Sequence, residues 1–182
     1  MEIEEEKDLI KRLCSVNETD KAFAELVNIY KERLYWHIRY MLKNHEDTDD
    51  VLQNVFIKVY KNIKKFKGDS LLYSWMYRIA RNESITFLKK RSKMLKISSE
   101  ELQNYIVDNL ESDVYFEGDK IQIQLQKAIN TLPDKQREVF QLRYFEEMKY
   151  QEMAELLQTS ESALKSNYHH ASKKVEQYLK SN

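Results

Sequence analysis

The sequence contains few of the residues that interrupt helices or build tight turns: two glycines and one proline among 182 residues. Turn-dense β-sandwiches and barrels need many more of them, because tight turns require positive φ angles or a fixed φ. Strong helix formers dominate instead, and no convincing alternation of apolar and polar residues predicts a strand. We therefore expect an all-α protein.

Only one cysteine is present, Cys14, so no internal disulfide can form. A lone thiol suits a reducing compartment, and it is more often a small buried hydrophobe than a nucleophile. Segment 1–6 is acidic and lacks the apolar core of a secretory signal, and no apolar run is long enough to span a bilayer. These absences predict a cytoplasmic protein without membrane insertion.

The formal net charge of zero hides a strong segregation of charge along the chain. Residues 1–57 carry a balance of −5, residues 58–98 of +10, residues 99–119 of −7 and residues 120–182 of +2. An anionic polymer responds to a local positive band rather than to the overall balance. The basic segment is therefore a candidate for contact with nucleic acid.

The hydrophobic pattern divides the chain into two small helical domains joined by an acidic flexible linker. The first domain, residues 18–97, contains three amphipathic patterns, and a Gly-Asp-Ser break separates the second from the third. Residues 98–120 form the linker, in which Leu102, Tyr105, Ile106 and Leu110 could make a short partner-dependent helix. Residues 121–182 form the second domain.

The second helix of the first domain has an unusual outer face. Opposite its core stripe project Asp50, Gln53, Ile57 and Tyr60, so two large apolar side chains share a face with an acid and an amide. Such a mixture is typical of a protein-binding face. A second buried face of a helix in a small bundle explains it equally well.

Aromatic and basic residues alternate around the break at Phe66–Ser70 and in the helix after it. Tyr73, Trp75 and Tyr77 lie beside Lys64, Lys65, Lys67, Arg78 and Arg81. Rings that stack on bases and cations that hold phosphates are what unpaired nucleic acid requires. Trp75 alone is better explained as a core residue, whereas the loop and basic helix together favour nucleic acid.

The last third of the chain carries a helix-turn-helix pattern. Pro133 is suited to a helix start, and Ser160 is placed to cap a final helix whose buried stripe is Leu164, Tyr168, Ala171 and Val175. The opposite face carries Ser162, Ser166, His169 and Lys173, with Lys165 on its flank. In this motif the second helix enters the DNA major groove. An ordinary solvated helix face is the alternative.

Catalytic and metal-binding constellations are missing from the pattern. There is no carboxylate pair, glycine-rich phosphate loop or Cys/His cluster, and adjacent His169 and His170 point too far apart to ligate one ion. We expect no enzymatic activity, no cofactor, no metal and no small-molecule substrate.

Three blocks of this chain, in order, resemble bacterial RNA polymerase sigma factors of the extracytoplasmic-function (ECF) group of the sigma-70 family. The blocks are Asp49–Val59, then Phe66–Ser70 with Trp75–Asn82, and the helix-turn-helix segment, and the match covers about Ala22 to Tyr178. The resemblance implies a transcription initiation factor that binds core RNA polymerase, reads duplex promoter DNA and holds the melted strand. Members are commonly held inactive by an anti-sigma protein.

The resemblance also implies which residues make each contact. Those for core polymerase are Asp49, Asp50, Gln53, Asn54, Ile57 and Tyr60. Those for melting and the −10 element are Lys64, Phe66, Lys67, Asp69, Ser70, Tyr73, Trp75, Arg78, Arg81 and Asn82. Those for the −35 element are Lys149, Ser160, Ser162, Lys165, Ser166, His169, Lys173 and Lys174.

This chain departs from the family pattern at Leu72, where an aromatic is usual, and at Asn167 and His170, where arginines are usual. The promoter sequence therefore cannot be transferred from relatives. The competing interpretation is a helix-turn-helix regulator that acts without polymerase. Such a regulator would usually dimerise, and the sequence has no heptad seam.

Overall fold

The structure is a computed structural model that describes residues 3–15, 17–108 and 120–181. Every regular element in these residues is helical, which confirms the all-α prediction. The α-helices are α1 (Ile3–Leu13), α2 (Thr19–Leu42), α3 (His45–Asn62), α4 (Leu72–Leu95), α5 (Ser99–Asp108), α6 (Lys120–Asn130), α7 (Asp134–Tyr144), α8 (Tyr150–Leu157) and α9 (Glu161–Ser181). One 3₁₀ turn, η1 (Ile63–Lys65), extends α3.

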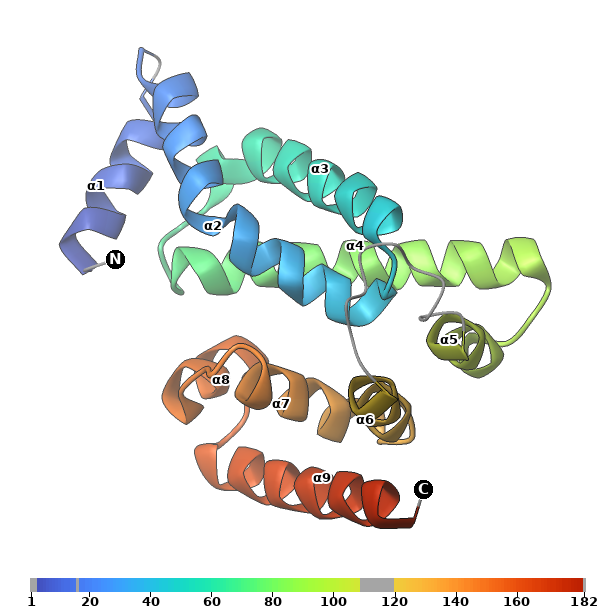
Figure 1. Cartoon of the computed structure of the whole chain (residues 1–182). Helices are drawn as coiled ribbons and strands as arrows, with labels where there is room; N and C mark the ends of the chain where they lie inside the picture. Colours follow the sequence, from blue (N-terminus) through green and yellow to red (C-terminus); the bar gives the residue numbers. More distant parts are fainter. Residues whose placement is uncertain (1–2, 16, 109–119, 182) are drawn as a thin grey trace.

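The first unit consists of α1–α4, with α2, α3 and α4 packed on one another (Figure 1). Their apolar stripes meet in a core that includes Leu26, Leu34, Val55 and Met76, all fully buried. The sharp turn between α2 and α3 has a local cause: Lys43 adopts the left-handed conformation, and the Asn44 side chain accepts the backbone N–H of Asp47 at 2.9 Å. This N-cap starts α3 immediately after α2 ends.

Helix α1 was not predicted from the sequence. Its Leu9 and Leu13 are fully buried, and it packs against α2, where Arg12 forms an ion pair with Glu25 at 2.7 Å. The acidic run of residues 4–6 occupies the first turn of α1, where negative charge favours a helix. The first unit therefore begins earlier than residue 18.

The expected linker is partly ordered. Residues 99–108 form α5, which packs on both α4 and α6 and buries Leu102, Ile106 and Val107. A capping box starts it: Ser98 Oγ accepts the N–H of Glu101, and the Glu101 carboxylate accepts the N–H of Ser98. The short helix that was expected to form only with a partner packs instead on α4 and α6 of the same chain. Leu110, expected in the same helix, lies outside the described residues.

The second unit consists of α6–α9. A core of Ala128, Ile129, Leu132, Phe140, Ala171 and Val175 joins α6, α7 and α9. Three of the four residues in the predicted stripe of α9 are buried, Leu164, Ala171 and Val175, and Tyr168 packs against them while partly exposed. The stripe prediction is confirmed.

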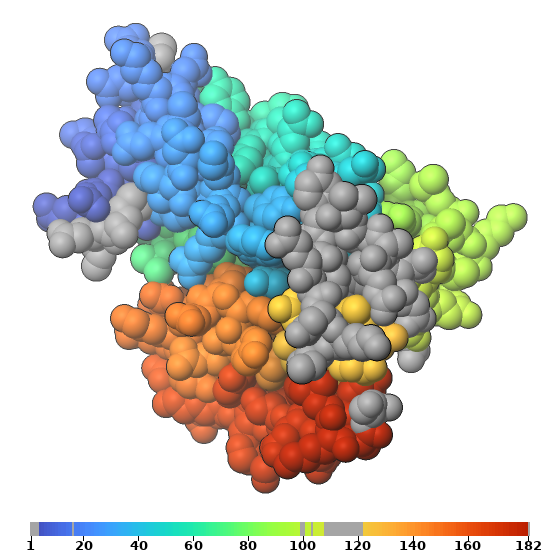
Figure 2. Space-filling model, viewed as in Figure 1, coloured from blue at the N-terminus to red at the C-terminus, as the bar shows by residue number. Residues whose placement is uncertain are grey.

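The two units lie directly against each other. Val139, Leu142, Met148, Met153, Leu156 and Leu164 of the second unit belong to the same apolar cluster as the core of the first. In Figure 1 the second unit lies along α2 and α4, with α9 as its outermost helix. The space-filling view shows the surfaces of α2 and of the α7–α8 region in contact (Figure 2). The chain thus has a closed arrangement.

Candidate polymerase and nucleic-acid interfaces

The residues predicted on the outer face of α3 lie together on an exposed surface. Asp49, Asp50, Gln53 and Asn54 are exposed, as are Ile57 and Tyr60 at 44% and 45%. The buried side of α3 carries Thr48, Val51, Val55 and Val59 instead. In the described part of the chain, the outer side of α3 is therefore not a second buried face of the helix.

Tyr60 is fixed at the end of this surface. Its hydroxyl donates to the Asp20 carboxylate at 2.9 Å, and its ring packs edge-on against Phe23 with centroids 4.9 Å apart. The hydrogen bond to Asp20 and the charge of that carboxylate raise the pKa of the Tyr60 hydroxyl. Within residues 3–15, 17–108 and 120–181, the side chains of Ile57 and Asp50 have no comparable restraint.

The predicted melting loop joins η1 to α4. Gly68 has a φ of 76°, a conformation that other residues adopt only with strain, and Lys64, Lys67 and Asp69 around it are exposed. Phe66 packs against Trp75 with ring centroids 5.3 Å apart, and both rings are partly buried against the core. The loop thus carries exposed polar side chains above the packed Phe66–Trp75 ring pair. Ser70 lies at the end of the loop.

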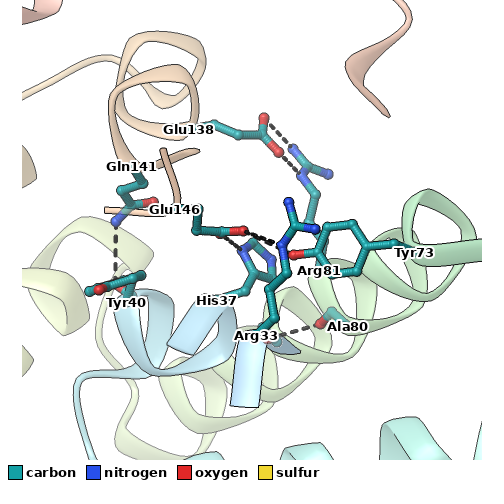
Figure 3. Close-up of polar contacts among 10 residues, drawn as sticks. Arg33, His37, Tyr40, Tyr73, Ala80, Arg81, Glu138, Gln141 and Glu146 are labelled. Carbon is teal, nitrogen blue, oxygen red and sulfur yellow. Dashed lines mark hydrogen bonds and ion pairs between the residues drawn. The ribbon is translucent and has the colours of Figure 1, made fainter. Parts of the chain in front are cut away.

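The predicted strand-binding residues of α4 do not all point the same way. Trp75, Arg78 and Asn82 share the side that continues from the loop, since they are three to four residues apart. Tyr73 and Arg81, eight residues apart, instead contact Glu146 and Glu138 of the second unit (Figure 3). The sequence grouped these five residues of α4 in one predicted site, whereas in the structure two of them contact the second unit.

Glu146, just after α7, lies at the centre of the contact between the units. Its side chain is only 4% exposed, and it accepts the Tyr73 hydroxyl at 2.9 Å. It also lies 3.5 Å from His37 Nδ1 and 3.9 Å from Arg33 Nε (Figure 3). Burial and the charge of Glu146 raise the pKa of the Tyr73 hydroxyl well above its ordinary value. This cluster was missed by sequence reasoning.

A second carboxylate of α7 meets the first unit nearby. Glu138 accepts Arg81 Nε at 2.5 Å and Arg81 Nη2 at 3.4 Å, a fork-like contact to both carboxylate oxygens. Arg33 adds a cation–π contact, with its guanidinium carbon 3.8 Å from the centroid of the Tyr73 ring. Two acids of the second unit thus lie on an aromatic and basic face of the first.

The helix-turn-helix consists of α8, a turn and α9. Gln158 adopts the left-handed conformation, with φ 50°, at the position where a glycine would be unstrained. Ser160 caps α9, accepting the N–H of Ala163 at 3.2 Å. The predicted reading face is exposed throughout: Ser162, Lys165, Ser166, His169, Lys173 and Lys174 on α9, and Lys149 before α8.

Lys165 is held in place on this face. Its ammonium lies 3.3 Å from the Glu161 carboxylate one turn earlier and 5.5 Å from the centroid of the Tyr150 ring. Sequence reasoning overlooked Glu161, which is exposed at the first position of the helix. Its carboxylate can accept a hydrogen bond from a cytosine amino group, so it belongs to the candidate reading face.

No group of three or more His, Cys, Asp or Glu side chains is placed to hold a metal ion in the part of the chain that the structure describes. Nor does any helix there combine the length and apolarity needed to cross a membrane.

Family models match both units. The model "Sigma-70 region 2" matches residues 26–94, which span most of α2 to α4, and "Sigma-70, region 4" matches residues 122–175, which span α6 to most of α9. The exposed face of α3 and the melting loop lie in the first match, and the helix-turn-helix lies in the second.

Whole-chain relatives agree with these models. The ECF RNA polymerase sigma-E factor of Haemophilus influenzae is 31% identical over 165 residues, covering 86% of both chains. The ECF RNA polymerase sigma factor SigW of Bacillus subtilis is 28% identical over 179 residues, covering 93% of this chain and 96% of the relative.

Two solved structures share the fold. CnrH in complex with the cytosolic domain of CnrY has a TM-score of 0.71 at 21% identity, covering 97% of this chain and 98% of the other. The sigma factor RpoE in complex with the anti-sigma factor NepR, from Bartonella quintana, has a TM-score of 0.63 at 20% identity, covering 88% and 98%. Taken with the family models and the sigma-E relative, these findings establish that the chain belongs to the sigma-70 family, among the ECF RNA polymerase sigma factors.

Proposed function

We propose that this sigma factor docks on core RNA polymerase through the exposed face of α3, where Asp50, Gln53, Ile57 and Tyr60 lie in line. The observation that carries the proposal is this face itself: two large apolar side chains remain exposed on a helix whose core side is fully packed. Apolar groups beside an acid and an amide fit the mixed character of protein interfaces.

The proposed DNA contacts are made by two other surfaces, the loop before α4 and the exposed face of α9. The loop at Lys64–Ser70, with Trp75, Arg78 and Asn82, offers rings and cations to an unpaired strand of the −10 element. The N-terminal half of α9 offers Glu161, Ser162, Lys165, Ser166 and His169 to the base edges of the −35 element, with Lys173, Lys174 and Lys149 placed for phosphates. Because its proposed partners, core RNA polymerase and promoter DNA, are cytoplasmic in bacteria, the proposal also assigns this protein to the cytoplasm.

An anti-sigma protein is the proposed negative regulator. RpoE of Bartonella quintana, which shares the fold, is in a complex with the anti-sigma factor NepR. A partner that covers the α3 face would compete directly with core polymerase.

The proposal is tested by transcription from fragmented bacterial genomic DNA with core polymerase, with and without the purified chain, followed by mapping of RNA 5′ ends. We expect new 5′ ends that share two sequence elements upstream at a fixed spacing. A regulator that acts without core polymerase would instead bind DNA and leave the pattern of 5′ ends unchanged.

A further inference from the structure

Helix α4, which carries predicted strand-binding side chains, begins without a cap of its own. The residue before it, Leu71, has an apolar side chain that cannot accept a hydrogen bond, and the first turn of α4 contains no acidic residue. The first backbone N–H groups of a helix need acceptors, and the positive end of the helix dipole favours a negative charge nearby. The start of α4 is therefore a place where a group from another part of the chain can stabilise the helix.

Glu6 of α1 supplies this group. Its carboxylate accepts the backbone N–H of Leu72, the first residue of α4, at 2.8 Å, although the two residues lie 66 positions apart in the sequence. The Tyr30 hydroxyl of α2 hydrogen-bonds the same side chain. Burial raises the pKa of that hydroxyl well above its ordinary value, and the charge of Glu6 adds to the shift. Glu6 thus joins α1 both to α2 and to the start of α4.

Helix α1 holds Glu6 in this position through its own packing. Leu9 and Leu13, three and seven residues after Glu6 and so on the same side of the helix, are fully buried. Arg12 forms two hydrogen bonds to the carboxylate of Glu25 on α2, at 2.7 and 3.1 Å. The Glu6 carboxylate therefore projects from an element that is anchored to the core of the first unit.

The capped residue is also where the melting loop ends. The loop begins at Phe66, whose N–H donates to the Ile63 carbonyl at 3.0 Å. At the capped end the Leu72 side chain is fully buried, whereas Leu71 before it is 38% exposed. Glu6 thus fixes the point at which the exposed loop continues into α4.

We propose that Glu6 is a positioning residue for promoter opening: by capping α4 it holds the end of the melting loop and the first turn of α4 in the geometry that receives an unpaired strand. The inference rests on the proposed function of this loop. Glu6 acts through the backbone of Leu72 rather than by touching DNA. It lies before the segment that the region 2 family model matches, which begins at residue 26.

The test compares Glu6→Ala with Glu4→Ala, which removes an exposed acid from the same turn of α1. Each full-length protein is combined with core polymerase, and the opening of a promoter taken from the mapped 5′ ends is followed by the permanganate reactivity of its thymines. The same proteins are assayed on a pre-melted copy of that promoter and for affinity to core polymerase. In the free protein, the NMR shift of the Leu72 amide proton reports its hydrogen bond to Glu6.

We expect Glu6→Ala to open the duplex promoter about fivefold more slowly than wild type, the factor that corresponds to the typical cost of one lost helix cap. Transcription from the pre-melted template and affinity for core polymerase should stay close to those of Glu4→Ala. The Leu72 amide proton should move upfield in Glu6→Ala and stay in place in Glu4→Ala, because only the first variant removes its carboxylate partner.

A cap supplied locally should replace Glu6. Leu71→Ser places a hydroxyl at the N-cap of α4, where the backbone, with φ −58° and ψ 142°, suits a capping side chain. The effect of Glu6→Ala on promoter opening should therefore be much smaller in a Leu71→Ser background than in wild type. If Glu6 served only to hold α1 in place, its removal would cause the same loss in both backgrounds.

Opening at the wild-type rate by a folded Glu6→Ala variant would overturn the inference alone. So would an equal loss on the duplex and pre-melted templates, or an equal loss with Leu71 and with Leu71→Ser. If Glu6→Ala fails to fold, Glu6→Gln keeps an oxygen that can accept the Leu72 N–H and removes the charge. It should give a smaller loss of opening in the same direction, and the absence of any loss would overturn the inference. Wild-type protein that opens no promoter with core polymerase would instead overturn the proposed function, and this inference with it.

Discussion

Lys43 lies at the junction of the two units, and its ammonium group is buried. It donates to the Gln126 side chain at 2.6 Å and to the Tyr40 carbonyl at 3.3 Å, both neutral oxygens. Burial, with the nearby charges of Arg137 and Arg39, lowers its pKa from 10.5 to about 7. This one lysine should therefore make the free energy of unfolding depend on pH.

The direction of this dependence follows from proton binding. Between pH 7 and pH 9 the unfolded chain keeps the proton on Lys43 while the folded chain loses it, so the free energy of unfolding rises with pH. Relative to a Lys43→Met variant, wild-type protein should gain roughly 2 kcal/mol over this range. Urea unfolding at several pH values measures it, and the comparison cancels the other titrating groups. Parallel profiles of the two proteins would show that Lys43 does not titrate in this range.

On α9, two lysines two turns apart should have different roles. Lys165 lies near the start of the helix, where side chains reach base edges, so Lys165→Ala should cost about 1–3 kcal/mol on the preferred −35 sequence and relax selectivity. Lys173 lies further along, so Lys173→Ala should weaken all sequences alike and reduce the salt slope by about one. Binding to matched and scrambled duplexes at several salt concentrations separates the two. Equal weakening of both duplexes by Lys165→Ala would make it a phosphate contact only.

At the scale of elements, the loop between η1 and α4 should act in promoter opening. A base that leaves the duplex loses stacking worth a few kcal/mol, and a protein surface must replace it. Replacing residues 66–71 by a Gly/Ser linker should reduce permanganate reactivity of promoter thymines, and a pre-melted template should partly restore transcription. Normal opening with the replaced loop would assign melting to another surface.

Elements whose signal is local were predictable from the sequence. The stripe of α9 and the outer face of α3 follow from spacing alone, because each helix repeats its pattern over several turns. Helix α1 was missed because its acidic first turn hides the spacing of Leu9 and Leu13. Glu138 and Glu146 were missed for another reason: their partners lie more than fifty residues away, and no local pattern marks such a contact.

At the scale of the whole molecule, the contact between the two units covers some of the predicted binding residues and leaves others exposed. The closed form buries Tyr73 and holds Arg81, while the exposed faces of α3 and α9 stay open to partners. The proposed polymerase-binding face of α3 is therefore accessible in this arrangement.

The central claim is that the outer face of α3 binds core RNA polymerase, and the affinity of core polymerase for an Asp50→Lys/Ile57→Ser variant tests it most directly. Tyr60 is left unchanged because it also packs on Phe23. The matched control is Glu155→Lys/Leu179→Ser, which makes the same changes at exposed positions of α8 and α9. We predict binding weaker by about tenfold or more for the α3 variant and unchanged for the control, with both folded by circular dichroism. Undiminished binding by a folded α3 variant would contradict the account.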